Sequence, residues 1–442
     1  MGRTGPFILC LNPWVYDFAA HDFFARPLGL LYLAGLLRSV GFQVAVLDCA
    51  SRPPGSRGPR GRWPKESLPT PLPLQGLPRR YSRYGLSMAQ VQDGLARQPR
   101  SPDAVLVTSL MTYWYPGVQA GIALVRQHFP NAPVILGGIY ATLCPEHARN
   151  YSGADYVHTG PGEEGLLSLL SDLIGLKAPP LELPDLDTLP YPAWDLLADR
   201  RMLPLVTSRG CPLSCDYCAS RLLVSRFRRR QPDNVIAELR YWHKRFGVTD
   251  VAFYDDALLY GADDHLLPVL EGVVRLELPL RFHTPNGLHV SLIDRRLAGW
   301  LKRANFATLR LGLETTATGA DRRDRKIQAG DLEKALAALR EAGFKPEDLG
   351  VYLLMGLPHQ EDEEVAESIR QVRRLRATPV LAQYSPIPQT ALWDEAVKVS
   401  RYDLAADPLY HNNSLFPCWP EFSWERYTRL KNLAAGRDER RK

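Results

Sequence analysis

The chain of 442 residues lacks a hydrophobic run long enough to cross a membrane. Its most apolar early stretch, LGLLYLAGLL from Leu28, stops at Arg38, well short of the about 20 apolar residues that a spanning helix needs. This stretch also lacks the preceding basic region and the cleavage site of a secretory signal. We therefore expect no membrane span and a cytoplasmic location.

Cysteine is scarce, and its distribution is uneven. The seven cysteines are an odd number, which fits a reducing compartment better than a disulfide framework. Three of them, Cys211, Cys215 and Cys218, lie within SRGCPLSCDYCAS. The spacing C-x3-C-x2-C is too tight for a disulfide framework and has one ligand too few for a structural zinc site. Three thiolates on one loop can hold three irons of a 4Fe–4S cube and leave the fourth iron open.

Charge is present in only mild excess. The net charge is +6, with 45% hydrophobic and 23% charged residues, which is the composition of an ordinary globular protein. This balance does not demand a nucleic-acid partner. The length allows two or three domains, each with a full core.

Residues 1–175 alternate short apolar runs with helical patterns. Strands are expected at 7–12, 43–49, 103–110, 132–138 and 154–160, with a helix over 28–41. Such β-α units predict an α/β fold, a Rossmann-like (flavodoxin-like) parallel sheet. Residues 51–83 break the rhythm as a Pro/Arg-rich loop insertion without a packed element, either solvated or a basic flap near the ligand edge.

A linker over 176–200 separates this sheet from a second β-α series in residues 201–400. Its strands are expected at 203–208, 250–256, 280–286, 308–314, 350–356 and 381–386. Six such units predict a partial (β/α)6 barrel, with the cysteine loop at the carboxyl end of its first strand, where barrels place their chemistry. Residues 401–442, including Trp419 and Trp424, form a C-terminal extension that either closes a substrate pocket or covers the barrel.

The cysteine loop after the first strand of this series resembles that of the radical S-adenosylmethionine (SAM) enzymes. The resemblance implies that Cys211, Cys215 and Cys218 are catalytic and bind a 4Fe–4S cluster whose open iron is chelated by SAM. One electron from the reduced cluster then cleaves the sulfonium to a 5′-deoxyadenosyl radical. Three buried core cysteines would match this spacing and the flanking Gly210 only by coincidence.

Other segments of the barrel agree with this resemblance. In TLRLGLET, period two turns Arg310 and Glu314 into the barrel, where they either meet the zwitterionic cosubstrate or pair with each other. In YSPIPQT, Gln389 stands where the family has glycine, which leaves the local turn open. The resemblance implies that SAM is bound by Tyr217, Asp256, Arg310, Glu314, Gly356 and Ser385.

The N-terminal sheet resembles the cobalamin-binding domain found ahead of the barrel in one radical SAM subgroup, through segments such as VILGGIYATLCPEHARN. An empty or nucleotide-binding domain is the alternative. Asp17 and His21 lie four apart instead of two, so we expect no histidine ligand to cobalt. The resemblance implies cobalamin contacts from Asn12, Pro13, Trp14, Ser109, Leu110, Met111, Gly137, Gly138, Gly160, Gly162 and Glu163.

These resemblances imply a cobalamin-dependent radical SAM methyltransferase that delivers the methyl group of methylcobalamin to an unactivated carbon. The alternatives are a B12-dependent radical SAM enzyme that cyclises or rearranges its substrate without net methylation, and a non-catalytic cobalamin-binding protein. The expected partners are a small-molecule or peptide substrate and an electron donor such as flavodoxin or ferredoxin. No segment resembles an added RNA-binding module, so nucleic acid is not expected.

Overall fold

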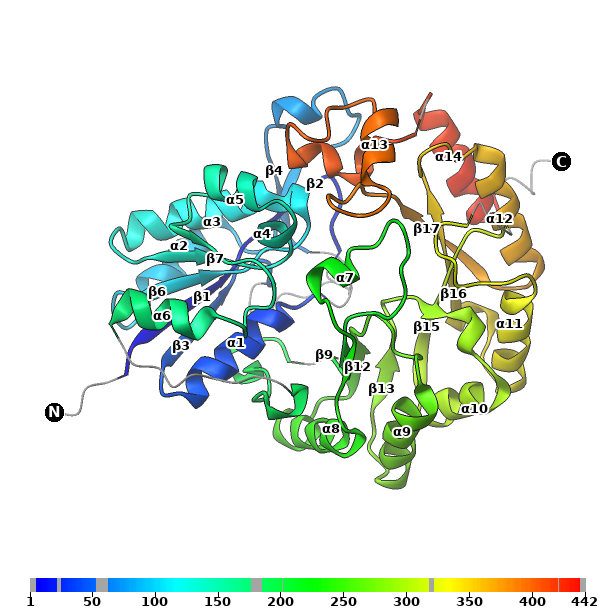
Figure 1. The fold of residues 1–442 in the computed structure, drawn as a ribbon, viewed down its shortest axis with the longest axis horizontal. Helices are drawn as coiled ribbons and strands as arrows, with labels where there is room; N and C mark the ends of the chain where they lie inside the picture. The colour runs from blue at the N-terminus through cyan, green and yellow to red at the C-terminus, as the bar shows by residue number, and fades with distance from the viewer. Residues whose placement is uncertain are drawn as a thin grey trace. The chain divides into compact units, whose positions relative to one another are not determined.

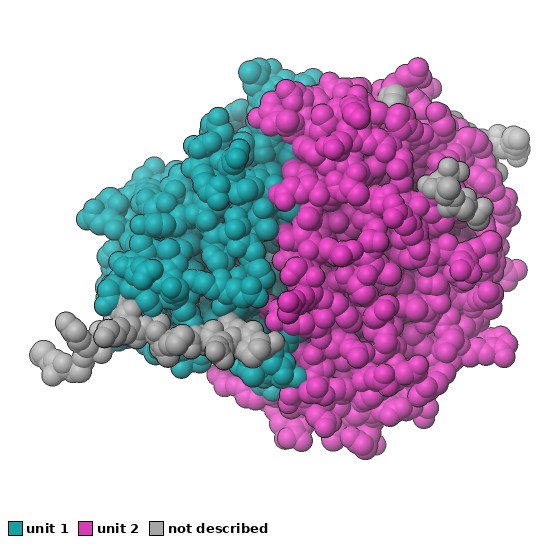
Figure 2. Space-filling model, in the orientation of Figure 1, with its two compact units in different colours: residues 1–200, 407–411 teal, residues 201–406, 412–442 magenta. Residues whose placement is uncertain are grey.

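The computed structural model describes residues 5–21, 25–52, 63–175, 185–200, 202–317, 322–419 and 421–437. Parts of the predicted insertion and linker, residues 53–62 and 176–184, lie outside these ranges. The chain divides into two compact units, residues 1–200 with 407–411 and residues 201–406 with 412–442 (Figure 2). Among the described residues, no helix has both the length and the apolar character needed to span a membrane.

Unit 1 is built on a five-stranded sheet in the order β3-β1-β6-β7-β8, and every pair in it is parallel. The strands are β1 (Phe7–Asn12), β3 (Gln43–Asp48), β6 (Ala104–Val107), β7 (Val134–Leu136) and β8 (Tyr156–Val157). This order is that of flavodoxin-like folds, whose ligands bind at the carboxyl ends of the strands. The predicted Rossmann-like fold is confirmed.

Helices cover both faces of this sheet because its central strands are apolar on both sides (Figure 1). Ile8 and Cys10 face one way and belong to the core under α1 and α6. Leu11 faces the other way, and a Cβ added to Gly121 of α3 would lie 3.1 Å from its side chain. The helices are α1 (Leu28–Ser39), α2 (Met88–Ala96), α3 (Tyr115–His128), α4 (Ile139–Leu143), α5 (Pro145–Tyr151) and α6 (Leu166–Ile174).

The segment predicted to be an unpacked loop contributes to a small sheet that also includes a strand after β1. β2 (Val15–Asp17), β5 (Ser82–Tyr84) and β4 (Lys65–Ser67) pair antiparallel in that order. The prediction that residues 51–83 form no packed element is therefore wrong for their described part. The prediction rested on the proline and arginine content and overlooked a few large apolar side chains that pack there. These are Trp63, Leu74 and Tyr81, each less than a tenth exposed.

Unit 2 is an open series of six parallel strands in chain order, which confirms the predicted partial barrel (Figure 1). These strands are β9 (Met202–Leu205), β12 (Asp250–Phe253), β13 (Arg281–His283), β15 (Phe306–Glu314), β16 (Leu349–Met355) and β17 (Thr378–Gln383), while β14 (Leu288–His289) adds to β15 and β10 (Ser208–Arg209) pairs with β11 (Arg228–Arg229). The helices are α7 (Ser220–Leu223), α8 (Pro232–Phe246), α9 (Leu266–Arg275), α10 (Arg295–Arg303), α11 (Asp331–Glu341), α12 (Asp362–Arg374), α13 (Trp393–Val399) and α14 (Trp424–Ala434).

The C-terminal extension contributes to both units. Residues 407–411 belong to unit 1, where the Tyr115 hydroxyl donates to the Asp407 carboxylate at 3.1 Å and Thr112 Oγ1 lies 2.9 Å from His411 Nδ1. Residues 412–442 belong to unit 2, where α14 packs on α12. The extension therefore supplies part of the packing of unit 1, a contribution that the sequence patterns do not indicate.

We predict that Tyr115→Phe destabilises unit 1 by about 1.5–3 kcal/mol, because the substitution removes the donor to a charged, half-buried carboxylate. Differential scanning calorimetry of the full chain measures this as a lower melting temperature of one transition. Tyr156→Phe, at a hydroxyl of a residue that is 39% exposed, is the control and should melt with the parent protein. Equal melting of the two variants would contradict the prediction.

Candidate functional site

The cysteine loop follows β9, and its two ends are held together by a short antiparallel ribbon. Ser208 pairs with Arg229 and Arg209 with Arg228, so the β10–β11 ribbon brings the two ends of the loop together. Gly210 follows with φ +83°, and a Cβ there would lie 2.9 Å from the Arg226 carbonyl oxygen. Only glycine fits this turn without strain, which explains why it stands directly before Cys211.

A buried carboxylate after β12 holds the start of this loop. Asp255 Oδ1 accepts hydrogen bonds from the Thr207 hydroxyl at 2.7 Å and from the Ser208 amide and hydroxyl at 2.5 and 2.6 Å. His265 Nε2 lies 2.9 Å from the same Thr207 hydroxyl. Burial raises the pKa of Asp255, while these donors lower it. Asp255 thus positions the loop, a role that sequence reasoning did not assign to it.

A second segment, residues 322–326, is tied to the outer part of the loop. The Asp216 amide donates to the Arg323 carbonyl at 2.9 Å, and Cys215 Sγ lies 3.7 Å from the Asp324 carbonyl oxygen. Arg325 pairs with the Asp216 carboxylate at 3.1 Å. Sequence reasoning missed this segment, which has no motif signal beyond its charge.

Arg322 fixes that segment to the end of β15. Its guanidinium pairs with the Asp324 carboxylate at 2.7 Å, and both side chains are almost fully buried. The same guanidinium donates to the carbonyl oxygens of Leu313, at 2.8 Å, and Thr315, at 2.6 Å. A buried pair with its remaining donors satisfied resists displacement, so the segment is held firmly against the strand end.

The three loop cysteines are chemically suited to a 4Fe–4S cluster. All three are free thiols, and each is partly or fully exposed, whereas Cys10, Cys49 and Cys418 are buried. Burial raises the pKa of Cys215 to about 11, and the charge of Lys326 lowers it. Within the described ranges, no three histidine, cysteine or carboxylate side chains converge to hold a single metal ion. A cube takes one thiolate for each iron, so its cysteines need not converge in that way.

Glu314 ends β15 in a strained conformation beside a lysine. Its φ of +69° lies in the left-handed region, and the register of β15 against β16 shifts between Gly312 and Glu314. The carboxylate lies 3.5 Å from Lys326 Nζ, and both side chains are mostly buried. Among the described residues no ion pair joins Glu314 to Arg310, so the alternative of a mutual pair is wrong.

The remaining residues predicted to bind SAM lie at strand ends or in the cysteine loop. The Tyr217 hydroxyl is buried and has no hydrogen-bond partner within the described ranges. Burial, then the charge of Asp255, raises the pKa of Asp256. Gly356 and Ser385 directly follow β16 and lie just beyond β17. A buried hydroxyl at this place can form a hydrogen bond with a bound ligand.

The turn after β17 also settles an expectation left open by the sequence. Gln389 replaces the glycine of the family turn and adopts a φ of +68°. The backbone therefore keeps the left-handed conformation that glycine would adopt freely, at a cost of about 1–3 kcal/mol for a residue with a side chain.

In unit 1, a narrow cavity of about 120 Å³ opens between α1 and the carboxyl ends of β6 and β7. Five of the residues predicted to contact cobalamin line it: Gly137, Gly138, Gly160, Gly162 and Glu163. A Cβ on Gly160 would meet nothing within 4 Å, and one on Gly137 only the His158 carbonyl oxygen at 3.9 Å. Because these glycines have no side chains, the slot stays open for a ligand group.

Ser109 shapes the slot through the protein itself. Its hydroxyl donates to the Gly137 carbonyl at 2.6 Å and accepts from the Ala141 amide at 3.3 Å. Gly138, with φ +96°, passes so close that an added Cβ would lie 2.3 Å from the Ser109 carbonyl oxygen. The neighbouring Leu110 and Met111 are more than a third exposed, so they can meet a large apolar ligand directly.

At the end of β1, the side chains of two residues predicted to contact cobalamin form hydrogen bonds with other parts of unit 1. Asn12 Nδ2 donates to Asp48 at 2.6 Å, and the buried Trp14 indole donates to the Leu86 carbonyl at 2.7 Å. Asp17 accepts from the Trp114 indole at 2.7 Å, whereas His21 is exposed.

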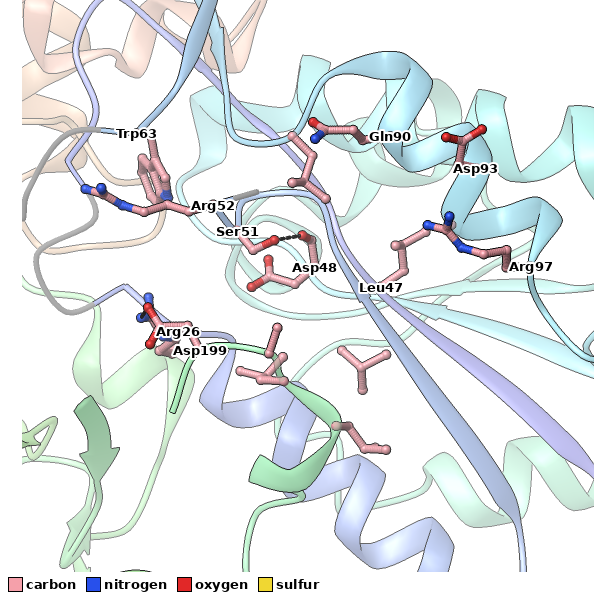
Figure 3. A pocket seen from close by; sticks show the side chains of 16 residues that line it. Arg26, Leu47, Asp48, Ser51, Arg52, Trp63, Gln90, Asp93, Arg97 and Asp199 are labelled. Carbon is pink, nitrogen blue, oxygen red and sulfur yellow. Dashed lines mark hydrogen bonds and ion pairs between the residues drawn. The ribbon is translucent and has the colours of Figure 1, made fainter. Parts of the chain in front are cut away.

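A second cavity in unit 1, of about 440 Å³, lies outside the edge strand β3 (Figure 3). Gln90 and Asp93 of α2, with Arg97 directly after it, lie along one side, and the Arg26–Asp199 ion pair lies across from them. None of the residues predicted to bind a cofactor lines it. Size alone therefore does not mark the site of chemistry.

Two family models match the chain, one in each unit. Residues 205–372 match the Radical SAM superfamily, and residues 88–170 match the B12 binding domain. The chain therefore contains a Radical SAM superfamily domain and a B12 binding domain. The cofactors of these domains are a 4Fe–4S cluster with SAM, and cobalamin.

Two curated proteins and one solved structure show what the chain is similar to. It is 26% identical to an uncharacterized methyltransferase of Pyrococcus horikoshii, over 67% of this chain and 70% of that protein. It is 22% identical to the anaerobic magnesium-protoporphyrin IX monomethyl ester cyclase of Rubrivivax gelatinosus, over 66% of this chain and 58% of the cyclase. The structure of the radical SAM methyltransferase TsrM of Kitasatospora setae, with cobalamin and a 4Fe–4S cluster bound, has a TM-score of 0.68 at 18% identity and covers 97% of this chain and 91% of that chain. This similarity shows a shared fold.

We predict that Asp255→Asn lowers the iron content of the reconstituted protein severalfold, because the neutral side chain makes weaker hydrogen bonds to Thr207 and Ser208 and its amide nitrogen cannot accept the Thr207 amide bonded to Oδ2. Iron and sulfide analysis measures the loss, and corrin content should stay unchanged. Asp264→Asn, at an exposed carboxylate in the same unit, is the matched control. Full iron content in Asp255→Asn would show that the carboxylate does not hold the loop.

We predict that Gly138→Ala reduces corrin content at least tenfold and leaves the iron content unchanged. The new Cβ would collide with the Ser109 carbonyl, and the turn that forms the slot would have to move. Visible spectroscopy after purification with cobalamin measures the corrin. Gly299→Ala, at an open helical position of unit 2, should behave as the parent protein. Retained corrin in Gly138→Ala would place the ligand outside this slot.

Proposed function

We propose that the protein is a cobalamin-dependent radical SAM methyltransferase that acts on an unactivated carbon of its substrate. The observation that carries this proposal is the pairing of two sites in one chain. A cysteine loop stands at the carboxyl end of the first barrel strand, and a glycine-lined slot opens at the carboxyl edge of the B12-type sheet. Methyltransferases among the similar proteins support methylation as the reaction.

We assign the cluster to Cys211, Cys215 and Cys218. When bound, the cluster and cobalamin supply the one-electron and methyl-transfer chemistry of the reaction. Asp255 holds the entry of the loop, and the segment after Arg322 holds its outer part. These contacts fix the thiols before any ligand arrives, which lowers the cost of ordering the site.

We assign SAM to the strand ends that surround the loop. The buried, unpartnered Tyr217 hydroxyl offers a polar contact there, and the mostly buried carboxylate of Glu314 can meet an ammonium group. Arg310 lies on the same strand as Glu314, and its guanidinium donates to the Leu309 carbonyl at 3.2 Å. Asp256, Gly356 and Ser385 complete the proposed set.

We assign cobalamin to the slot of unit 1. Gly137, Gly138, Gly160, Gly162 and Glu163 would admit its narrow nucleotide tail, and the exposed side chains of Leu110 and Met111 would pack on its ring. Ser109 would shape the turn. Asn12, Pro13 and Trp14 complete the proposed set at the carboxyl end of β1.

The second candidate function is cyclisation or rearrangement without net methylation. The similarity to the anaerobic cyclase favours it, since that protein matches two thirds of this chain. A non-catalytic cobalamin-binding protein is disfavoured by the complete cysteine triad and its ordered support.

We also propose a small-molecule or peptide substrate, reduction by a flavodoxin or ferredoxin, and a location in the cytoplasm. The seven cysteines are all free thiols, as a reducing compartment requires. A low-potential electron donor is needed because the cluster must be reduced before it acts.

The test begins with anaerobic purification in the presence of cobalamin, followed by iron, sulfide and corrin analysis. We expect about four irons and one corrin for each chain, as one cube and one cobalamin require. The triple variant Cys211→Ala, Cys215→Ala, Cys218→Ala should lose the iron and keep the corrin. Iron without corrin would overturn the methyl-transfer proposal, and neither cofactor would overturn the assignment of both sites.

The two candidate reactions differ in the fate of the methyl group. With SAM labelled in its methyl group and a reductant, we expect label in the corrin fraction of the parent protein and of the triple variant supplied with reduced cobalamin. A cyclase that uses cobalamin only for electron transfer would leave that fraction unlabelled. Gly138→Ala serves as the control that lacks the corrin site.

A further inference from the structure

A buried lysine, Lys326, lies beside the cysteine loop, and no sequence motif predicts its position. The Lys326 side chain is 8% exposed, and its Nζ lies 3.5 Å from Glu314 Oε1. An ammonium group is rarely buried unless a carboxylate or another anion compensates it. The distance to Glu314 is long for an ion pair, so this carboxylate compensates the lysine only partly.

The position of Lys326 is fixed by the contacts of its own segment. Two residues earlier, the Asp324 carbonyl oxygen lies 3.7 Å from Cys215 Sγ, and the Asp324 carboxylate is clamped by Arg322 at 2.7 Å. One residue earlier, Arg325 pairs with Asp216 of the cysteine loop. The ammonium group therefore stays next to the loop instead of turning to solvent.

Charge effects agree with this placement. Burial, then the charge of Lys326, lowers the pKa of His289 to about 4. Burial lowers the pKa of Lys326, but the neighbouring negative charges, that of Glu314 first, outweigh burial and leave this pKa raised.

We propose that Lys326 is a positioning residue that raises the reduction potential of the cluster held by Cys211, Cys215 and Cys218. This inference rests on the proposed function, because it requires the cluster. Reduction adds one electron, taken from an external reductant, to a cluster already made negative by its thiolates. A fixed cation in a poorly solvated place stabilises the added charge more than it stabilises the oxidised cluster.

Glu314 acts in the opposite direction in the same pair. Its carboxylate lies 3.5 Å from the ammonium group and cancels part of the lysine charge. Removal of the lysine and removal of the carboxylate should therefore shift the potential with opposite signs. A general disturbance of the fold would not produce such a pattern.

The test is a redox titration of the reconstituted full chain, followed by electron paramagnetic resonance of the reduced cluster, without SAM. At the parent's midpoint potential, Lys326→Met should lower the ratio of reduced to oxidised cluster about tenfold, which is about 59 mV for one electron. Lys326→Arg, which keeps the charge, should titrate close to the parent. Lys334→Met, at an exposed lysine of the same unit, makes the same charge change and should titrate with the parent.

A second variant, Glu314→Gln, keeps the proposal testable if Lys326→Met does not fold. Glu314→Gln should shift the midpoint upward, and the double variant Glu314→Gln, Lys326→Met should fall between the two single variants. Equal midpoints for Lys326→Met and Lys334→Met, or a downward shift in Glu314→Gln, would overturn the role of Lys326. A parent protein without iron would instead overturn the proposed function, so the two failures are distinguishable.

Discussion

The cysteine loop depends on one buried carboxylate. Asp255 accepts hydrogen bonds from backbone and side chains of both Thr207 and Ser208, the two residues that carry the chain from β9 into the loop. A buried carboxylate without these donors would be costly, and the donors without it would be left unsatisfied. The interaction therefore joins the ends of β9 and β12 and decides where the loop leaves the sheet.

The outer half of the loop depends on a second buried group, the Arg322–Asp324 pair. Because Arg322 also takes up the carbonyl oxygens at the end of β15, the strand end, the charged segment and Cys215 form one connected structure. The left-handed backbone of Glu314 fits this arrangement, since a strained residue persists only where its surroundings fix it. Strain and buried charge thus gather at the carboxyl ends of the strands.

The candidate site of unit 1 is an open slot, whereas that of unit 2 is built around buried charged side chains. Its slot exists because glycines stand where strands and loops approach one another, and Ser109 holds the wall through the Gly137 carbonyl. The larger cavity outside β3 has more volume but gathers none of the residues that the family pattern selects. A ligand site is marked by its chemistry and its place at the sheet edge, and only secondarily by its volume.

The sequence by itself determined the two β-α series, their order and the cysteine loop at the first barrel strand, because apolar periodicity and thiol spacing are local properties. It also selected the glycines of the slot. Only the tertiary structure decided that Lys326 and not Arg310 pairs with Glu314, that β4 and β5 pack within a proline-rich segment, and that residues 407–411 complete unit 1. These contacts join residues far apart in the chain, and which of them form depends on packing that no local pattern records.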